Sequence, residues 1–106
     1  MNLEFLRVND NEHEIAHNDK IAGVFRFYED PDFSYAGIKL TRFLGYIRLE
    51  PEFRRLGILR RIIEEFNIKS LMVDDIEDVD IDTLKRIYQR LGFRSIEGSE
   101  RFMIRD

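Results

Sequence analysis

Residues 54–59, Arg-Arg-Leu-Gly-Ile-Leu, combine the groups that bind a phosphate or pyrophosphate. Gly57 stands where an apolar, strand-like run gives way to an amphipathic helix, and glycine lets the backbone approach a ligand closely. The helix that follows adds unpaired N–H groups and the positive end of its dipole. The sequence therefore predicts an anion site at the start of this helix. Four arginines crowd the same place: Arg54, Arg55, Arg60 and Arg61.

This segment resembles the acyl-CoA signature of the GNAT N-acetyltransferase superfamily. That signature reads Gln or Arg, two residues of any type, Gly, one residue of any type, and then Gly or Ala. Arg54 takes the first position and Gly57 the first glycine, while Leu59 stands where the second glycine or alanine belongs. Upstream, residues 46–53 resemble the family's strand that ends in a Pro-Glu-Tyr-like turn. Downstream, residues 88–93 resemble its second landmark, Tyr-x-x-x-Gly-Phe.

The resemblance implies an α/β fold with an α+β mixed sheet, the GNAT-like acyl-CoA N-acyltransferase fold, in a single domain over residues 1–106. The sheet would splay around its central strand and hold coenzyme A in the gap. The implied activity is an N-acetyltransferase that moves an acetyl group from acetyl-CoA to a primary amine of a protein or polyamine. Backbone groups of Ile47 and Leu49 would hold the pantetheine arm and polarise the acyl carbonyl. The pyrophosphate would meet the side chains of Arg54 and Arg55 and the backbone of Leu56, Gly57, Ile58, Leu59 and Arg60.

Two residues are candidates for moving protons. Tyr88 matches the tyrosine that protonates the departing thiolate in many GNAT members, a general-acid role typically worth about 10²–10⁴-fold. Glu50, at the end of the central strand, is the nearest candidate for the base that deprotonates the amine, with Glu52 beside it. Each residue also has a purely structural interpretation. Tyr88 would be a half-buried aromatic residue on an amphipathic helix, and Glu50 and Glu52 would be solvated turn residues. Leu59 likewise has two interpretations, an obstruction of the pyrophosphate site or a residue of the core.

One part of the GNAT fold is missing from the sequence. GNAT folds place two helices between the first and second strands, where they wall the acceptor site. Here only about residues 9–12 separate the first predicted strand from the next segment. A missing wall fits an enzyme whose acceptor is a whole protein. It also fits a function of another class, a non-catalytic regulator that binds acyl-CoA or a protein partner and acts by docking.

Residues 13–17, His-Glu-Ile-Ala-His, match the zinc motif His-Glu-x-x-His. That motif works on a helix, where both imidazoles share one face and reach one metal ion. On a strand the two histidines would lie about 13 Å apart. Turn-forming flanks and the lack of helical periodicity predict an exposed strand here, so we expect no metal site.

Composition bounds the remaining possibilities. The chain has 106 residues, with 43% hydrophobic and 36% charged side chains, which is typical of one globular domain. It has no cysteine, which excludes disulfides and thiolate chemistry, and no apolar run approaches the roughly 20 residues of a membrane span. No signal peptide is apparent, so we expect the cytoplasm. The net charge of −4 argues against nucleic-acid binding, and the acidic stretch 74–82 would favour a cationic acceptor.

Hydrophobic periodicity predicts the strands that would position these residues. We expect strands at residues 3–8, 21–28 and 68–73. Residues 35–49 read as one long strand whose apolar phase changes, which predicts a β-bulge or a turn between residues 41 and 46, where Gly45 would accommodate either. In the strand 21–28, one face would carry Ile21, Gly23, Phe25 and Phe27.

Two helices complete the prediction. The first presents Ile58, Ile62, Ile63 and Phe66 on one face, and the strand–helix–strand order around it predicts a parallel strand pair. The second would begin at Asp80 or Asp82 and end at Gly92. Residues 93–96 and 101–105 would form a terminal hairpin. The apolar stripe of the second helix is Ile81, Leu84, Ile87, Tyr88 and Leu91.

Overall fold

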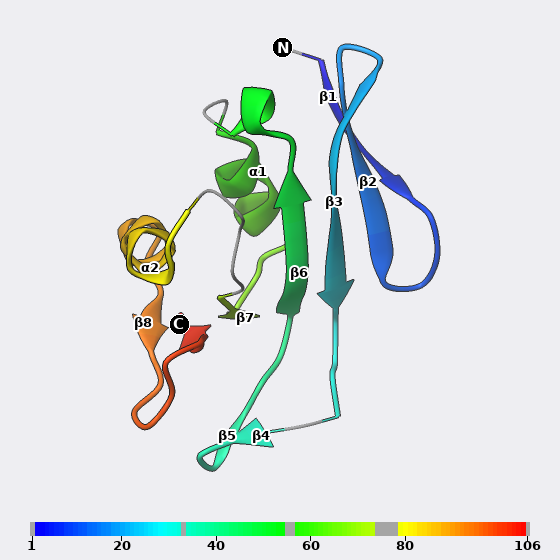
Figure 1. Ribbon diagram of the computed structural model, residues 1–106. Coiled ribbons are helices and arrows are strands. Elements are labelled where there is room, and N and C mark those ends of the chain that lie inside the picture. The colour runs from blue at the N-terminus through cyan, green and yellow to red at the C-terminus, as the bar shows by residue number, and fades with distance from the viewer. Residues whose placement is uncertain (1, 33, 55–56, 74–78, 106) are drawn as a thin grey trace.

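The computed structural model describes residues 2–32, 34–54, 57–73 and 79–105, and these residues have the mixed α+β architecture that the sequence predicts. Within them, a seven-stranded sheet in the order β1-β2-β3-β6-β7-β9-β8 carries two α-helices (Figure 1). The helices are Ile58–Glu65 (α1) and Ile81–Arg90 (α2), and a short 3-10 helix spans Pro51–Phe53 (η1). The strands are Leu3–Arg7 (β1), Glu12–His17 (β2), Lys20–Tyr28 (β3), Ser34–Tyr35 (β4), Ile38–Lys39 (β5), Phe43–Leu49 (β6), Ser70–Met72 (β7), Arg94–Ser95 (β8) and Phe102–Ile104 (β9).

Strand directions follow the predicted connections. β6 and β7 are parallel, with α1 between them in the chain, which confirms the predicted parallel pair. The other neighbouring strands in the sheet are antiparallel. The terminal hairpin is confirmed, and its second strand, β9, inserts between β7 and β8.

Both α-helices pack on one face of the sheet and form the main hydrophobic core. α1 contributes Ile58, Ile62 and Ile63, each at most 1% exposed, so its predicted apolar face is confirmed. α2 contributes Leu84 and Tyr88. Burying an aliphatic side chain of this size is worth about 1.5–3 kcal/mol, so this layer fixes both helices over the sheet.

The opposite face of the sheet, here called the outer face, is covered over only part of its extent. The β4–β5 hairpin packs there in a second cluster with Leu40, Phe43 and Ile96. Over β1, β2 and β3 the outer face is open, and Leu6 and Ile21 are 43% and 53% exposed.

The outward position of Ile21 corrects the sequence prediction that it shares a face with Phe25. The register of β2 and β3 shifts between the pairs Ile15–Gly23 and Ala16–Ile21, which leaves Ala22 as an extra residue in β3. Such a bulge changes the side-chain phase. Ala22 and Phe25 are therefore fully buried, whereas Ile21 points outward.

The predicted phase change near Gly45 is confirmed as a β-bulge. Arg26 pairs with Tyr46 and the next residue, Phe27, pairs with Leu44, so Gly45 is the extra residue of β6. A Cβ at Gly45 would lie 2.9 Å from the ring of Tyr28, which is why glycine suits this position.

The single long strand expected over residues 35–49 is wrong. The chain instead turns between β4 and β5 at Ala36 and Gly37, which have φ of 51° and 79°. It turns again at Arg42, with φ of 44°, before β6 begins. The turn at Arg42 falls within residues 41–46, where the change of apolar phase predicts a bulge or a turn, whereas the turn at Ala36 was not predicted, because non-glycine residues adopt such left-handed angles infrequently.

The ends of α2 are as predicted. Asp80 is its N-cap, and the Asp80 carboxylate accepts a hydrogen bond from the Thr83 N–H at 2.8 Å. That bond holds the pKa of Asp80 below its usual value. Gly92 follows the helix with φ of 97°, an angle that favours glycine.

The N-terminal segment forms a hairpin with no helix in it. β1 and β2 are antiparallel neighbours joined by residues 8–11, all of which are described, so the two helices that GNAT folds place here are absent. The His-Glu-x-x-His segment coincides with β2, the strand that the sequence favoured over a zinc-binding helix. His13 stacks on Phe25 with a ring separation of 5.0 Å, and His17 lies edge-on to Phe53.

Candidate functional site

The sheet opens into a fork between its two parallel strands. Among the described residues, β6 and β7 pair at Phe43–Ser70 and Leu44–Leu71, and the Gly45 bulge follows immediately. Beyond it, β6 continues to Leu49, and in the part of the chain that the structure describes only β3 pairs with this stretch. The edge of β6 that faces away from β3 therefore borders a cavity.

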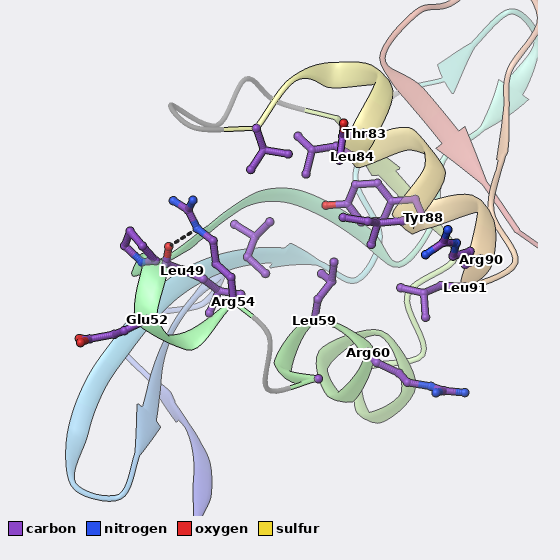
Figure 2. A pocket seen from close by; sticks show the side chains of 15 residues that line it. Leu49, Glu52, Arg54, Leu59, Arg60, Thr83, Leu84, Tyr88, Arg90 and Leu91 are labelled. Carbon is purple, nitrogen blue, oxygen red and sulfur yellow. Dashed lines mark hydrogen bonds between the residues drawn. The ribbon is translucent and has the colours of Figure 1, made fainter.

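Backbone groups of β6 point into this fork. The Glu50 N–H donates to the Ala22 carbonyl of β3 at 2.8 Å. Because consecutive residues of a strand direct their backbone groups to opposite neighbours, those of Ile47 and Leu49 point away from β3. The Leu49 carbonyl accordingly accepts a hydrogen bond from Arg54 Nε at 3.2 Å (Figure 2).

A cavity of about 730 Å³ lies between β6, the start of α1 and α2 (Figure 2). Residues of β6, η1, α1 and α2 contribute to its lining, so segments far apart in the sequence converge on it. Seven predicted site residues line it: Ile47, Leu49, Arg54, Gly57, Leu59, Arg60 and Tyr88. Arg55 and Leu56, also predicted, lie outside the described residues, as do residues 74–78 of the acidic stretch.

The start of α1 borders the cavity with N–H groups that make no hydrogen bond within the helix. Gly57 is the N-cap, with φ of 72°, and no side chain caps the helix. The first intrahelical bond runs from the Arg61 N–H to the Gly57 carbonyl at 3.1 Å, so the N–H groups of Ile58, Leu59 and Arg60 have no acceptor within the helix. Ile58 has a buried side chain, and thus offers the site only its backbone.

Tyr88 is placed by packing at the wall of the cavity. It is 3% exposed, and its ring lies edge-on to that of Phe93 with centroids 6.1 Å apart. Figure 2 shows its hydroxyl directed into the cavity. A phenol in this position is held close to whatever group occupies the fork.

Leu59 was interpreted either as a residue of the core or as an obstruction at the pyrophosphate site, and its position has features of both. Its half-buried side chain packs against the edge of the main core and also lines the cavity. In Figure 2 it extends from α1 toward α2. Leu59 is therefore part of the cavity wall.

Glu50 lies elsewhere. Its carboxylate accepts a hydrogen bond from Arg48 at 3.2 Å and lines a second depression, on the outer face, with Glu12 and Glu14. Successive side chains of a strand point to opposite faces, so the side chain of Leu49 lines the cavity and that of Glu50 lies on the outer face. The structure does not bring Glu50 and Tyr88 to one cavity, and the base role of Glu50 stays a prediction.

Sequence reasoning missed the contribution of α2 beyond Tyr88. Thr83, Ile87 and Arg90 also line the cavity, and Arg90 adds a guanidinium to those of Arg54 and Arg60. Ile87 belongs to the apolar stripe predicted for α2. It is 38% exposed and lines the cavity, so the stripe could have indicated this residue.

Metal sites and membrane-spanning helices are both absent from the part of the chain that the structure describes. There, no three His, Cys, Asp or Glu side chains gather as metal ligands. None of the described helices has the length and hydrophobicity needed to cross a bilayer.

Solved structures identify this architecture. A protein from Pyrococcus horikoshii OT3, PH1933, matches 91% of the chain with a TM-score of 0.63 and 17% identity. YhhK from E. coli, described as a candidate N-acetyl transferase and solved bound to coenzyme A, matches 95% with a TM-score of 0.61 and 19% identity. A GNAT-family acetyltransferase from Listeria monocytogenes matches 89% with a TM-score of 0.51 and 17% identity. The chain has the fold of the GNAT acetyltransferases.

The GNAT likeness is one of fold, at low sequence identity. The chain spans 64% of the Pyrococcus protein, 77% of YhhK and 62% of the Listeria protein. No protein-family profile and no curated protein sequence matches it.

Proposed function

We propose that this protein binds acetyl-CoA in the fork cavity and transfers the acetyl group to a primary amine. The observation that carries this proposal is the convergence of three features on one cavity: the N–H groups at the start of α1, the fork-facing backbone of β6, and Tyr88. The coenzyme A bound to YhhK, a protein of the same fold, supports the choice of ligand.

Each feature matches one part of acetyl-CoA. The N–H groups and dipole at the start of α1, with Arg54 and Arg60, suit a pyrophosphate. The amide-rich pantetheine arm suits the backbone donors and acceptors of Ile47 and Leu49, and the largely apolar walls suit its methylene groups.

The reaction then follows from the positions of the groups. The amine nitrogen attacks the thioester carbonyl carbon, the carbon–sulfur bond breaks, and the thiolate takes a proton from the Tyr88 hydroxyl. Backbone N–H groups of β6 stabilise the oxyanion. The amine must lose a proton, and Glu50 would take it only from an amine that arrives from the outer face, where its carboxylate lies.

A calorimetric titration with acetyl-CoA tests the binding step. We expect saturable binding to the wild-type chain and its loss in Gly57→Glu. A Cβ at Gly57 would meet nothing within 4 Å, so the substitution adds a charge at the anion site without a clash, at a cost of about 1–2 kcal/mol for the positive φ. Absence of wild-type binding, or equal affinity in a folded Gly57→Glu variant, contradicts the proposal.

The second candidate is a non-catalytic regulator that binds acyl-CoA. Two observations favour it: the absence of helices between β1 and β2, and the separation of Glu50 from Tyr88. Turnover with lysine peptides and polyamines decides between the candidates. Acetyl-CoA that binds but is never consumed in their presence favours the regulator.

A further inference from the structure

The open part of the outer face carries most of the exposed apolar side chains of the described residues. Among the described residues, four large apolar side chains are more than a third exposed, and three of them, Leu6, Val8 and Ile21, lie on this face. The fourth, Ile87, lines the fork cavity. α1 and α2 both pack on the opposite face of the sheet, so neither covers these three side chains (Figure 1). A gathering of exposed apolar side chains on one face marks a contact surface.

Charges on the outer face are divided by strand. β2 contributes Glu12 and Glu14, whereas β3 and β6 contribute Arg26 and Arg48. Glu12 and Arg26 are cross-strand partners 3.2 Å apart, yet 28% and 53% of these two side chains stay exposed. At the level of Glu12 and Arg26, the β2 side of the face is therefore acidic and the β3 side is basic, whereas Glu50, after β6, adds a carboxylate that pairs with Arg48 at 3.2 Å.

At these two positions the face is complementary to itself. A twofold axis that runs parallel to the strands, between β2 and β3, places the β2 side of one copy over the β3 side of the other. Strand register then sets Glu12 over Arg26 of the second copy. It also sets the small side chain of Ala16 over the exposed Ile21 of the second copy. An axis perpendicular to the strands would instead set acid over acid.

We propose that the outer face is the interface of a homodimer, in which two sheets pack face to face about this axis. Four strands about 4.8 Å apart, each contributing about 20 Å of length, give an area of roughly 400 Å² per copy. Stable complexes bury about 800 Å² per partner, so we expect the dimer to be weak. The inference does not depend on the proposed acetyl transfer.

Complementing charge reversals test the interface. Glu12→Arg sets arginine over arginine in its own homodimer, and Arg26→Glu sets glutamate over glutamate. Mixed together, the two variants restore an opposite-charge pair at both symmetry-related positions. The Glu12–Arg26 contact within each chain stays broken in the mixture, so a recovery can come only from contacts between chains.

Sedimentation equilibrium on the full chain, from 1 to 200 µM, measures the outcome. We expect the wild type to dimerise, each single variant to bind itself at least about tenfold more weakly, and the mixture to recover a heterodimer. The matched controls Glu97→Arg and Arg94→Glu change the same charges at exposed positions near the far edge of the sheet and should dimerise like the wild type. A wild type that is monomeric at 200 µM overturns the proposal. So does a dimer that survives both reversals, or a mixture that fails to recover.

Discussion

Replacing Leu59 by alanine measures what this side chain does at the fork. Truncating a fully buried leucine costs about 2–5 kcal/mol, and the half-buried Leu59 should cost about 1–2 kcal/mol. For a domain of this size, that corresponds to a fall in Tm of roughly 4–16 °C. Alanine is the best helix former, so helix propensity adds no further loss.

The effect on the ligand follows from the cavity. A volume of about 730 Å³ is open with leucine in place, so Leu59 does not fill the site. Its loss removes apolar wall, and we expect acetyl-CoA to bind about two- to fivefold more weakly in calorimetry. Ile63→Val is the control, because Ile63 is 1% exposed, lies on the same helix and is absent from the cavity lining. This control should cost about 0.5–1.5 kcal/mol and leave affinity unchanged.

Tighter binding in Leu59→Ala would refute this reasoning. It would mean that the leucine occupies space that the cofactor needs, the interpretation that the signature's glycine or alanine suggests. An unchanged affinity with a lower Tm would make Leu59 a core residue alone.

Three further predictions concern single residues. Tyr88→Phe removes the proton donor and keeps the ring against Phe93, so turnover should fall about 10²-fold with nearly constant acetyl-CoA affinity, and a fully active variant would reassign the acid. Gly57→Ala should lower unfolding free energy by about 1–2 kcal/mol through the positive φ, measured by denaturant titration; no loss would mean that this turn relaxes. Burial, with Arg7 nearby, lowers the pKa of His13 from 6.5, so its contribution to stability should be complete above about pH 6.5 and decline as pH falls below it. His13→Phe should remove this pH dependence and His17→Gln should keep it.

The sequence predicted those parts of the site that depend on local chemistry. Gly57 and Gly92 mark positions where the backbone adopts positive φ, and both fall at helix ends as expected. Asp80 caps its helix by accepting a hydrogen bond from Thr83, three residues later in the chain. The buried face of α1 follows from the 3.6-residue period of its apolar side chains. Local rules of this kind need no knowledge of the rest of the fold.

The register of the strands was harder to predict, because one inserted residue moves every following side chain to the opposite face of the sheet. The Gly45 bulge left a visible phase change in the apolar pattern. The Ala22 bulge left none, since alanine, glycine and isoleucine are all compatible with either face, and Ile21 was therefore assigned to the wrong side. The turn at Ala36 uses a positive φ at a residue that rarely adopts it, and no feature of the apolar pattern predicted it.

The placement of Glu50 connects the two proposals and gives the last prediction. Glu50 lines the outer depression together with Arg26 and Arg48, residues of the proposed dimer interface. A dimer on this face would cover the route by which an amine reaches Glu50. If Glu50 is the base, turnover per chain should therefore decline as protein concentration rises through the dimer dissociation constant.

The variant Arg26→Glu, which weakens the dimer, separates this effect from simple crowding. Its turnover per chain should stay constant over 1–200 µM, while that of the wild type falls in step with the dimer fraction measured by sedimentation. Glu50→Gln should abolish most of the monomer's activity, since an amide accepts no proton at neutral pH. A wild-type rate per chain that is independent of concentration, in protein shown to dimerise, would exclude Glu50 and the outer face from the acceptor's path. The amine would then have to enter the fork from the helix-covered side.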